Sequence, residues 1–327
     1  MKNIFFICFC ALFAFSGCAD DDDDLLTGGN VDIDLLPDAK PNDVVDPQVF
    51  EAINLNYPGL EKVKEFYEAG EHYYAANALL EYYRTRTNVT NPNLSLINVT
   101  ISEAEQAKAD YALVDYRFHV NNFYEDKETL KPYSVKQDGG INWEYSPKDA
   151  SDEYQKQLHR HQWFIPQAKA YRVSGDEKYI QSWIEVYKNW IENNPKPTTG
   201  PNTTSWWQLQ VSTRIGDQVQ LLEYFKNSVN FTPEWLSTFL VEFAEQADFL
   251  VDYPYESGGN ILISQANALA TAGTLMPEFK NAEKWMNTGY QILSEEVQNQ
   301  IMSDGWHKEM SLHYHIGIVA VFFVAMA

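Results

Sequence analysis

Cysteine is scarce in this chain of 327 residues, and all three cysteines lie within the first 18 positions. Cys8 and Cys10 stand in an apolar stretch near the N-terminus, and Cys18 follows that stretch closely. The rest of the sequence carries no thiol. Structural disulfides, cysteine nucleophiles and cysteine-ligated metals are therefore excluded from that remainder.

Basic residues are also few. The chain has 24 Lys and Arg against 46 Asp and Glu, which gives a formal net charge of -22. Binding to nucleic acid requires clustered Lys and Arg that neutralise phosphates, so we expect no nucleic-acid partner. An acidic polysaccharide would be repelled at long range, and a site for one must therefore be locally basic.

The first residues have the pattern of an export signal. A short basic start is followed by the apolar run Ile4 to Phe15, which is too short to span a bilayer, so we expect residues 1–17 to be a signal peptide. Ser16-Gly17-Cys18 resembles a bacterial lipobox, and the run Asp20 to Asp24 resembles the acidic tag of surface lipoproteins in Bacteroides-like Gram-negative bacteria. We expect an exported lipoprotein in the periplasm or on the outer membrane, held to the membrane only by lipid on Cys18. The alternative is a plain secreted protein with an acidic linker.

The chain then divides into a tether and a helical domain. Residues 18–47 are polar and acidic with scattered Gly and Pro, which is typical of a flexible tether. From residue 48 to 327 the apolar residues recur with helical spacing. The clearest helical stretches are Glu153 to Val173, Glu177 to Glu192, Trp207 to Asn227, Pro233 to Val251, Ile261 to Thr274 and Phe279 to Met302.

Short loops with Gly or Pro separate these stretches, which predicts helical hairpins. Hairpins that each expose an apolar face must stack, either as an open solenoid or closed into a ring. No fixed 34-residue period is present, so we predict an all-α fold, an incomplete α/α toroid of helical hairpins. The segment Tyr111 to Tyr145 is loop-rich and carries little helical signal.

Two polar clusters near the end of the sequence could carry chemistry. Gly258-Gly259-Asn260 lies about fifty residues before the segment Glu309 to His315, which includes Tyr314. An amide, a phenol and imidazoles can together remove a proton from a carbon next to a carboxylate. Asn260 could instead cap a helix, and Tyr314 could be a core aromatic. His307, His313 and His315 could hold zinc, but no His-Glu-x-x-His motif is present, so we expect no metal.

A second set of candidates lies earlier in the chain. Leu158 to Phe164 gathers His161, Gln162 and Arg160, and the helix after Trp206-Trp207 places Arg214 seven residues further on. Arg160 and Arg214 would supply the local basic patch that a uronic acid requires. Core packing is the alternative for Trp206, and a salt bridge is the alternative for Arg214. Asn142 is a weaker candidate on a loop.

These motifs, in this order, resemble the heparinase II/III family of polysaccharide lyases over residues 48 to 315. They are Leu-x-Arg-His-Gln-Trp-Phe, Ala-Tyr-x-x-x-Gly-Asp-Glu-Lys-Tyr, Trp followed by Arg-Ile-Gly, Gly-Gly-Asn, and Asp-Gly followed by Glu-x-Ser-x-x-Tyr-His. The resemblance implies an incomplete toroid followed by a C-terminal β-sandwich. It also implies β-elimination next to a uronic acid of heparan sulfate or a related glycosaminoglycan, by a monomer that needs no cofactor.

The resemblance also implies roles for residues. Asn260 would neutralise the uronate carboxylate, and Tyr314 would take the C5 proton and return a proton to the leaving oxygen. The remaining matched or neighbouring candidates would bind substrate: His161, Gln162, Trp207, Arg214, His315, Asn142 and Glu309. His315 would in addition orient Tyr314. His159 stands where the family motif has Asn.

The family uses a further histidine and a β-sandwich that do not occur in this sequence. The ending Ile316 to Ala327 has the composition of a buried helix, and we expect this polypeptide by itself to be inactive or nearly so. Three other functions remain open. They are a toroid glycoside hydrolase that uses Asp304 and Glu309, a surface glycan-binding lipoprotein, and a lyase for another uronate polymer such as alginate.

Overall fold

The computed structural model describes residues 38, 40–120, 133–148 and 153–326, with only the backbone for residues 323–326. Residues from Lys40 onward form one compact unit. The predicted signal peptide, most of the predicted tether and the expected lipidation site Cys18 lie outside the described residues.

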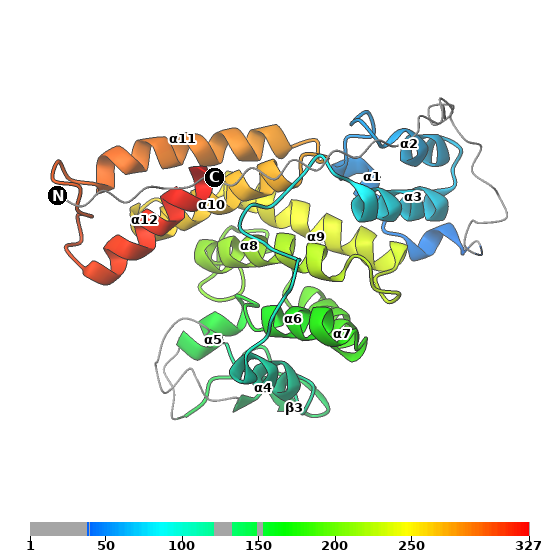
Figure 1. Cartoon of the computed structure of the whole chain (residues 1–327), viewed down its shortest axis with the longest axis horizontal. Coiled ribbons are helices and arrows are strands. Elements are labelled where there is room, and N and C mark those ends of the chain that lie inside the picture. The colour runs from blue at the N-terminus through cyan, green and yellow to red at the C-terminus, as the bar shows by residue number, and fades with distance from the viewer. Residues whose placement is uncertain (1–37, 39, 121–132, 149–152, 327) are drawn as a thin grey trace, which may run out of the picture. The chain divides into compact units, whose positions relative to one another are not determined.

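The first helices of this unit pack against a helix from much later in the chain. They are η2 (Asn42–Val44), α1 (Gln48–Ala52), α2 (Glu61–Glu68) and α3 (His72–Thr85), and both α1 and α3 contact α9 (Pro233–Asp252), as Figure 1 shows. Val45 is buried, and the backbone N–H of Asp46 donates to Ser237 Oγ at 3.0 Å. The predicted tether therefore does not extend to residue 47, because residues 42–46 already belong to the packed domain.

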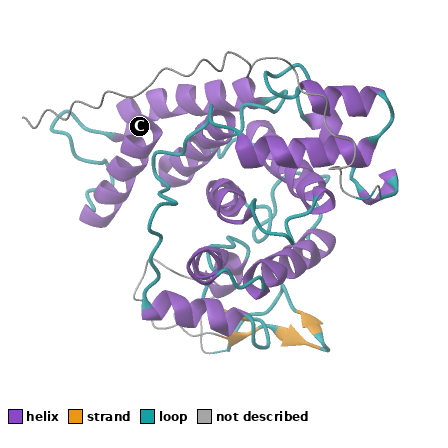
Figure 2. Ribbon diagram, turned by 45° about the vertical axis from the view of Figure 1, so that its right-hand side comes forward, coloured by secondary structure: helices purple, strands orange, loops and turns teal. Residues whose placement is uncertain are grey.

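The main array consists of helical hairpins (Figure 2). Its helices are α4 (Glu103–Ala112), α5 (Glu153–Leu158), α6 (Phe164–Ser174), α7 (Lys178–Asn193), α8 (Gln208–Phe225), α9, α10 (Gly259–Leu275), α11 (Ala282–Gln300) and α12 (Leu312–Met326). Within the array α7 packs on α6, α9 on α8 and α11 on α10. The even-numbered helices also contact one another in succession, α4 with α6, α6 with α8, α8 with α10 and α10 with α12.

This alternation fixes the direction of the helices. Successive members of a hairpin run antiparallel, so α6, α8, α10 and α12 run in the same direction and begin at the same edge of the array. We call the residues just before these four helices, together with their first turns, the N-terminal edge.

Short strands occur only in the predicted loop-rich segment, as far as the described residues show. β1 (Arg117–Phe118) pairs antiparallel with β2 (Tyr133–Ser134), and β3 (Lys136–Gln137) pairs antiparallel with β4 (Gly140–Ile141). The Phe118 ring stacks on Trp163 with ring centroids 3.7 Å apart. The segment thereby covers the turn that precedes α6.

Aromatic residues dominate the main core. Six tryptophans are almost completely buried among neighbouring rings, namely Trp163, Trp183, Trp190, Trp206, Trp235 and Trp285. A separate small cluster joins α10, α11 and α12 and consists of Ile263, Ala266, Ala270, Leu293 and Ile318. This second cluster fixes α12 against α10.

Two glycines allow α10 and α11 to approach closely. A Cβ added to Gly289 would lie 2.5 Å from the carbonyl oxygen of Ala266, and a Cβ added to Gly273 would lie 2.3 Å from that of Ala282. Real Cβ atoms do not approach backbone so closely, so no larger residue fits at either position without displacing a helix.

The predicted helical stretches agree with the structure except for one. Glu153 to Val173 was predicted as continuous, but the chain forms α5 and α6 with a turn between them. His161 in this turn has φ 64°, a left-handed conformation that redirects the chain between α5 and α6. The apolar spacing continues across the turn, and the turn itself contains neither Gly nor Pro.

Candidate functional site

The N-terminal edge brings together residues that are far apart in the sequence. Gln162 lies just before α6, Trp207 immediately before α8, Asn260 in the first turn of α10 and Tyr314 in the first turn of α12. The first turns of helices expose unpaired backbone N–H groups and the positive end of the helix dipole. Four such ends at one edge favour an anionic ligand, although the chain as a whole is acidic.

The two glycines before Asn260 change its expected role. Gly258 and Gly259 have φ values of 66° and 73°, and Gly258 occupies the N-cap position of α10 without a side-chain cap. Asn260 is therefore not the cap. Its side chain makes no hydrogen bond to any described residue, whereas its backbone carbonyl oxygen accepts from Ser264 Oγ at 2.8 Å. The amide group remains available to a ligand.

Glu309 lies beside the start of α10. A Cβ built on Gly259 would be 4.0 Å from Glu309 Oε1, although fifty residues separate the two in sequence. The turn that carries Glu309 is anchored by His307, which is fully buried with Nε2 2.9 Å from Gln300 Oε1. The backbone N–H of Glu309 donates to His307 Nδ1 at 3.4 Å. His307 thus has a structural role in holding this turn.

Tyr314 is 41% exposed, which excludes its alternative role as a core aromatic. Its helix neighbour His315 packs on Trp306 with ring centroids 4.6 Å apart, and His315 Nδ1 is buried with no hydrogen-bond partner among the described residues.

The packing of α12 on α10 brings together the first turns of the two helices, which carry Asn260 and Tyr314. Ile263 and Ile318 belong to the same buried cluster. Asn260 precedes Ile263 by three residues and Tyr314 precedes Ile318 by four, so each lies one turn before the contact, on the same face as its isoleucine. Because α10 and α12 run in the same direction, both side chains lie on the same side of this contact.

His161 and Arg214 lie in the interior rather than at a surface. His161 is 3% exposed and is surrounded by aromatic rings, among them Trp190 at 4.9 Å. Arg214 is fully buried. Its guanidinium donates to Gln246 Oε1 at 2.9 Å and to the carbonyl oxygens of His159 and Ser205 at 2.7 Å each.

Because both side chains are buried, neither His161 nor Arg214 can contact a substrate in this arrangement. The prediction that these two residues line the subsites is therefore wrong. The expected surface basic patch at Arg214 is absent for the same reason. Arg214 instead ties α8 to α9 and to the turn before α6, and its guanidinium carbon lies 4.3 Å from the centre of the Trp190 ring.

His159 and His161 favour their neutral forms. Burial and the nearby Arg214 guanidinium lower the pKa of His159 to about 3. The same causes, with His159 in addition, hold the pKa of His161 well below its usual range. His159 Nδ1 accepts a hydrogen bond from Trp190 Nε1 at 3.1 Å, which fixes the ring in its neutral form.

The other candidates differ in how accessible they are. Trp207 is half-buried, with its ring 6.5 Å from that of Tyr255 in an edge-on arrangement. Asn142 is engaged by its own loop, because its amide nitrogen donates to Gln137 Oε1 at 2.6 Å and its side-chain oxygen accepts from the Glu144 N–H at 3.0 Å. Trp206 is a core residue, in agreement with the alternative expected for it.

Sequence reasoning missed two polar residues in a pocket between α8 and α10. Asp217 and Asn267 each carry a buried side-chain oxygen without a hydrogen-bond partner among the described residues. No sequence signal singled out Asp217, because it is one carboxylate in a helical stretch of mixed polar and apolar residues.

Two further features are absent from the described ranges. No three His, Cys, Asp or Glu side chains come together there as ligands for a metal ion. None of the helices seen there combines the length and the apolar character needed to cross a bilayer.

Comparison with known proteins places this geometry in a family. Residues 49–327 match the family model described as the heparinase II/III N-terminus. The chain belongs to the heparinase II/III family. It is 99% identical over 326 residues to the heparin-sulfate lyase of Bacteroides thetaiotaomicron, and this match covers 100% of the chain and 46% of that relative. It is 39% identical to the heparin-sulfate lyase of Bacteroides stercoris, covering 85% of the chain and 43% of that relative.

Solved structures in the heparinase II/III family have the same helical fold. A crystal structure of heparinase III aligns with a TM-score of 0.83 at 99% identity, covering 86% of this chain and 43% of that one. A heparan sulfate lyase from Pedobacter heparinus aligns with a TM-score of 0.71 at 33% identity, covering 85% of this chain and 43% of that one. These matches confirm the predicted fold class. The chain spans less than half the length of these relatives.

Proposed function

We propose that this chain carries part of the active site of a polysaccharide lyase that cleaves heparan sulfate, or a related uronic-acid glycosaminoglycan, by β-elimination. The observation that supports the proposal is the packing of α10 on α12, because Asn260 and Tyr314 lie in the first turns of these two helices at the N-terminal edge. The names of the relatives support the choice of substrate, since each is called a heparin-sulfate lyase.

The proposed reaction requires a proton to leave C5 of the uronate ring. The Asn260 amide donates hydrogen bonds to the uronate carboxylate, where negative charge grows as that proton departs, and the helix N-termini add to this stabilisation. Tyr314 in its phenolate form takes the C5 proton. The electron pair forms the C4–C5 double bond, the C4–O bond breaks, and the phenol returns a proton to the departing oxygen.

The remaining residues of the N-terminal edge would bind and orient the glycan. In this proposal Trp207 packs its exposed ring surface against a sugar, and Gln162 hydrogen-bonds to a neighbouring unit. His315 orients Tyr314 from the adjacent position in α12. Glu309, beside Gly259, accepts hydrogen bonds from sugar hydroxyl groups. Asn142 contributes only if its loop releases the contacts to Gln137 and Glu144. The elimination needs no cofactor.

The chemistry of the product tests the proposal. When the chain is part of a longer polypeptide, we expect heparan sulfate to yield fragments that end in a C4–C5 unsaturated uronate, which is read as rising ultraviolet absorbance. The chain by itself should yield little or no such product. The assay should use the chain as it stands and the chain joined to the remaining length of the Bacteroides thetaiotaomicron relative. New reducing ends without absorbance would indicate a hydrolase, and binding without cleavage by the longer polypeptide would indicate a glycan-binding protein. Either result overturns the proposal. Cleavage of alginate but not of heparan sulfate would identify alginate as the substrate.

We also propose that the mature chain is a lipoprotein that is anchored through Cys18 in the periplasm or at the surface of a Bacteroides-like bacterium. The lipobox-like tripeptide and the acidic run after it support this. The expected result is recovery of the chain in the membrane fraction, with release into the soluble fraction for Cys18→Ser. A wild-type chain that is soluble after export would contradict the anchor.

A further inference from the structure

The pocket that Asp217 and Asn267 line lies between α8, α10 and the loop of residues 90–93. We call it the α8–α10 pocket. It has a volume of about 300 Å³, at the lower end of the range of ligand sites, which is roughly 300–1,000 Å³. The polar residues that line it include Asn93, Asp217, Gln220, Asn267, Thr271 and Tyr290. The loop is ordered by its own contacts, since Asn91 Oδ1 accepts from the Asn93 N–H at 3.0 Å.

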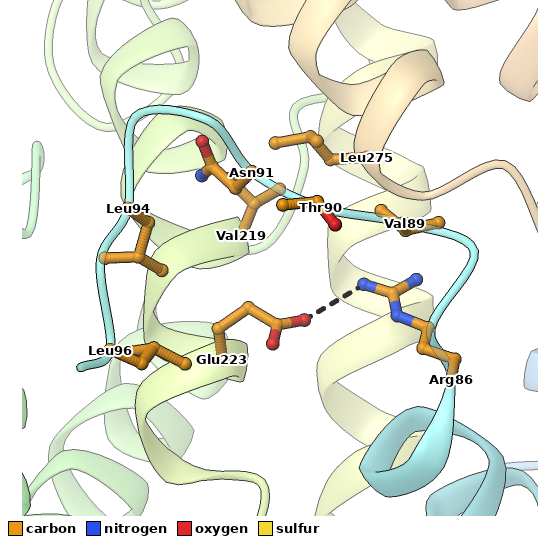
Figure 3. A pocket seen from close by; sticks show the side chains of 9 residues that line it. All are labelled: Arg86, Val89, Thr90, Asn91, Leu94, Leu96, Val219, Glu223 and Leu275. Carbon is orange, nitrogen blue, oxygen red and sulfur yellow. Dashed lines mark hydrogen bonds and ion pairs between the residues drawn. The ribbon is translucent and has the colours of Figure 1, made fainter. Parts of the chain in front are cut away.

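The α8–α10 pocket adjoins a smaller one of about 170 Å³, which Figure 3 shows from close by. The two pockets share the wall formed by Thr90, Asn91, Val219 and Leu275. The smaller pocket contains Arg86, whose guanidinium is paired with Glu223 at 3.1 Å and with the buried Glu278 at 2.9 Å. This cation is therefore committed to the protein rather than to a ligand.

The α8–α10 pocket holds hydrogen-bond acceptors that the protein leaves unsatisfied. Asp217 Oδ2 on α8 and Asn267 Oδ1 on α10 are both buried, and neither has a hydrogen-bond partner among the described residues. A buried polar atom without a partner costs about 1–3 kcal/mol, so such atoms in a folded protein require an explanation. Two of them in the wall of one pocket indicate that an entering ligand supplies donors.

The charges of the pocket restrict the ligand. Among the described residues its lining contains no Lys, Arg or His, so no cationic side chain there would pair with a sulfate or a carboxylate. Burial raises the pKa of Asp217 to about 8, so this carboxyl group is mostly protonated at neutral pH and attracts cations weakly. A neutral ligand with several hydroxyl groups fits both properties, because each hydroxyl can donate and accept.

The pocket is separate from the N-terminal edge. Asp217 follows Trp207 by ten residues along α8, and Asn267 follows Asn260 by seven residues along α10. At a helical rise of 1.5 Å per residue these spacings correspond to about 15 Å and about 10 Å. A sugar in this pocket would therefore not occupy the position of the uronate at Asn260.

We propose that the α8–α10 pocket binds one uncharged, hydroxyl-rich sugar unit, whose hydroxyl groups hydrogen-bond with the Asp217 carboxyl group and donate to Asn267 Oδ1. The site goes beyond the proposed lyase function, because it requires neither a uronate nor an elimination. A negative result here would leave the lyase proposal standing. If the lyase assay failed, the proposal for the pocket could still be tested, because that test measures sugar binding rather than cleavage.

Gly216 provides a direct way to block the pocket. It lines the cavity within α8, and a Cβ added there would meet no atom within 4 Å. Gly216→Leu should therefore fill the pocket without straining the helix, and Gly216→Ala is the matched control that adds only the Cβ. The probes are N-acetylglucosamine and glucose, with inorganic sulfate for comparison, and binding is measured by saturation-transfer NMR.

We expect the wild-type chain and Gly216→Ala to bind at least one of the two sugars and not sulfate. Gly216→Leu should weaken that binding by about tenfold or more, which corresponds to about 1.4 kcal/mol. Asn267→Leu removes one acceptor and should also weaken sugar binding. This variant replaces Gly216→Leu in the test if circular dichroism shows that Gly216→Leu does not fold. Absence of binding to both sugars, unchanged binding in the folded variants, or stronger binding of sulfate would each overturn the proposal.

Discussion

Replacing Tyr314 with Phe is expected to reduce formation of the unsaturated product by about 10²–10⁴-fold, the range for loss of a general acid–base group. The substitution removes only the hydroxyl oxygen that would accept the C5 proton. The ring, which is 41% exposed, keeps its contact with its neighbour His313. We therefore expect the glycan to bind nearly as before, so that the loss appears in kcat rather than in KM.

Tyr111→Phe is the matched control for this substitution. Tyr111 lies on α4, is 45% exposed and belongs to neither of the proposed sites. Its variant should retain full turnover in the longer polypeptide. Turnover by Tyr314→Phe within twofold of the wild type would show that another group removes the proton. A large rise in KM with unchanged kcat would show that Tyr314 only binds.

The second prediction is that the free energy of unfolding falls in acid because of His159. His159 is neutral in the folded protein at a pKa of about 3, whereas an unfolded histidine titrates near 6.5. Between these values the unfolded chain binds a proton that the folded chain does not, so stability falls as the pH falls below about 6.5. At pH 5 this one residue should lower the free energy of unfolding by about 2 kcal/mol, at about 1.4 kcal/mol per pH unit.

His159→Asn tests this directly, because Asn keeps an acceptor for Trp190 Nε1 but does not titrate. Urea unfolding followed by tryptophan fluorescence at pH 7.5 and pH 5 gives the comparison. We expect the variant to lose about 2 kcal/mol less than the wild type between these two conditions. The buried Asp217 and Glu242, whose pKa values are raised, titrate in both proteins and cancel in the difference. Identical pH dependence in the two proteins would show that His159 is not held neutral.

The helices were predictable from the sequence because their apolar spacing and their stop signals agree. Gly175, in the left-handed conformation, ends α6 where the sequence predicted a stop. The capping box of Ser102 and Glu105 begins α4, and Pro233 begins α9 after the capping Thr232. Such signals act within one turn of the chain, which makes them readable without a structure.

The burial of the candidate residues could not be predicted in the same way. Arg214 is buried because carbonyl oxygens at His159 and Ser205 and a side chain at Gln246 meet its guanidinium. Partners this far apart in sequence become neighbours only through the packing of the hairpins. A polar side chain in a sequence pattern therefore indicates that partners are needed, but not whether the protein or a ligand provides them.

Asn260 and Asp217 are two further residues whose surroundings could not be predicted from local sequence rules. A local rule favoured Asn260 as a helix cap, but the positive φ values of Gly258 and Gly259 place the cap two residues earlier and leave the amide unpaired. Asp217 received no weight in the sequence, because one carboxylate on a helix is usually solvated. Its place in a pocket wall depends on α10 and on the loop of residues 90–93.

The central claim is that Asn260 and Tyr314 act together on one uronate, and a double-mutant cycle on the rate of unsaturated-product formation tests it most directly. Residues that serve one transition state show non-additive losses. In the longer polypeptide, the combination of Asn260→Ala with Tyr314→Phe should therefore lose little more activity than the more damaging single variant. Losses that multiply to the product of the two single effects would mean that the two residues act independently, and the shared site at the N-terminal edge would be contradicted.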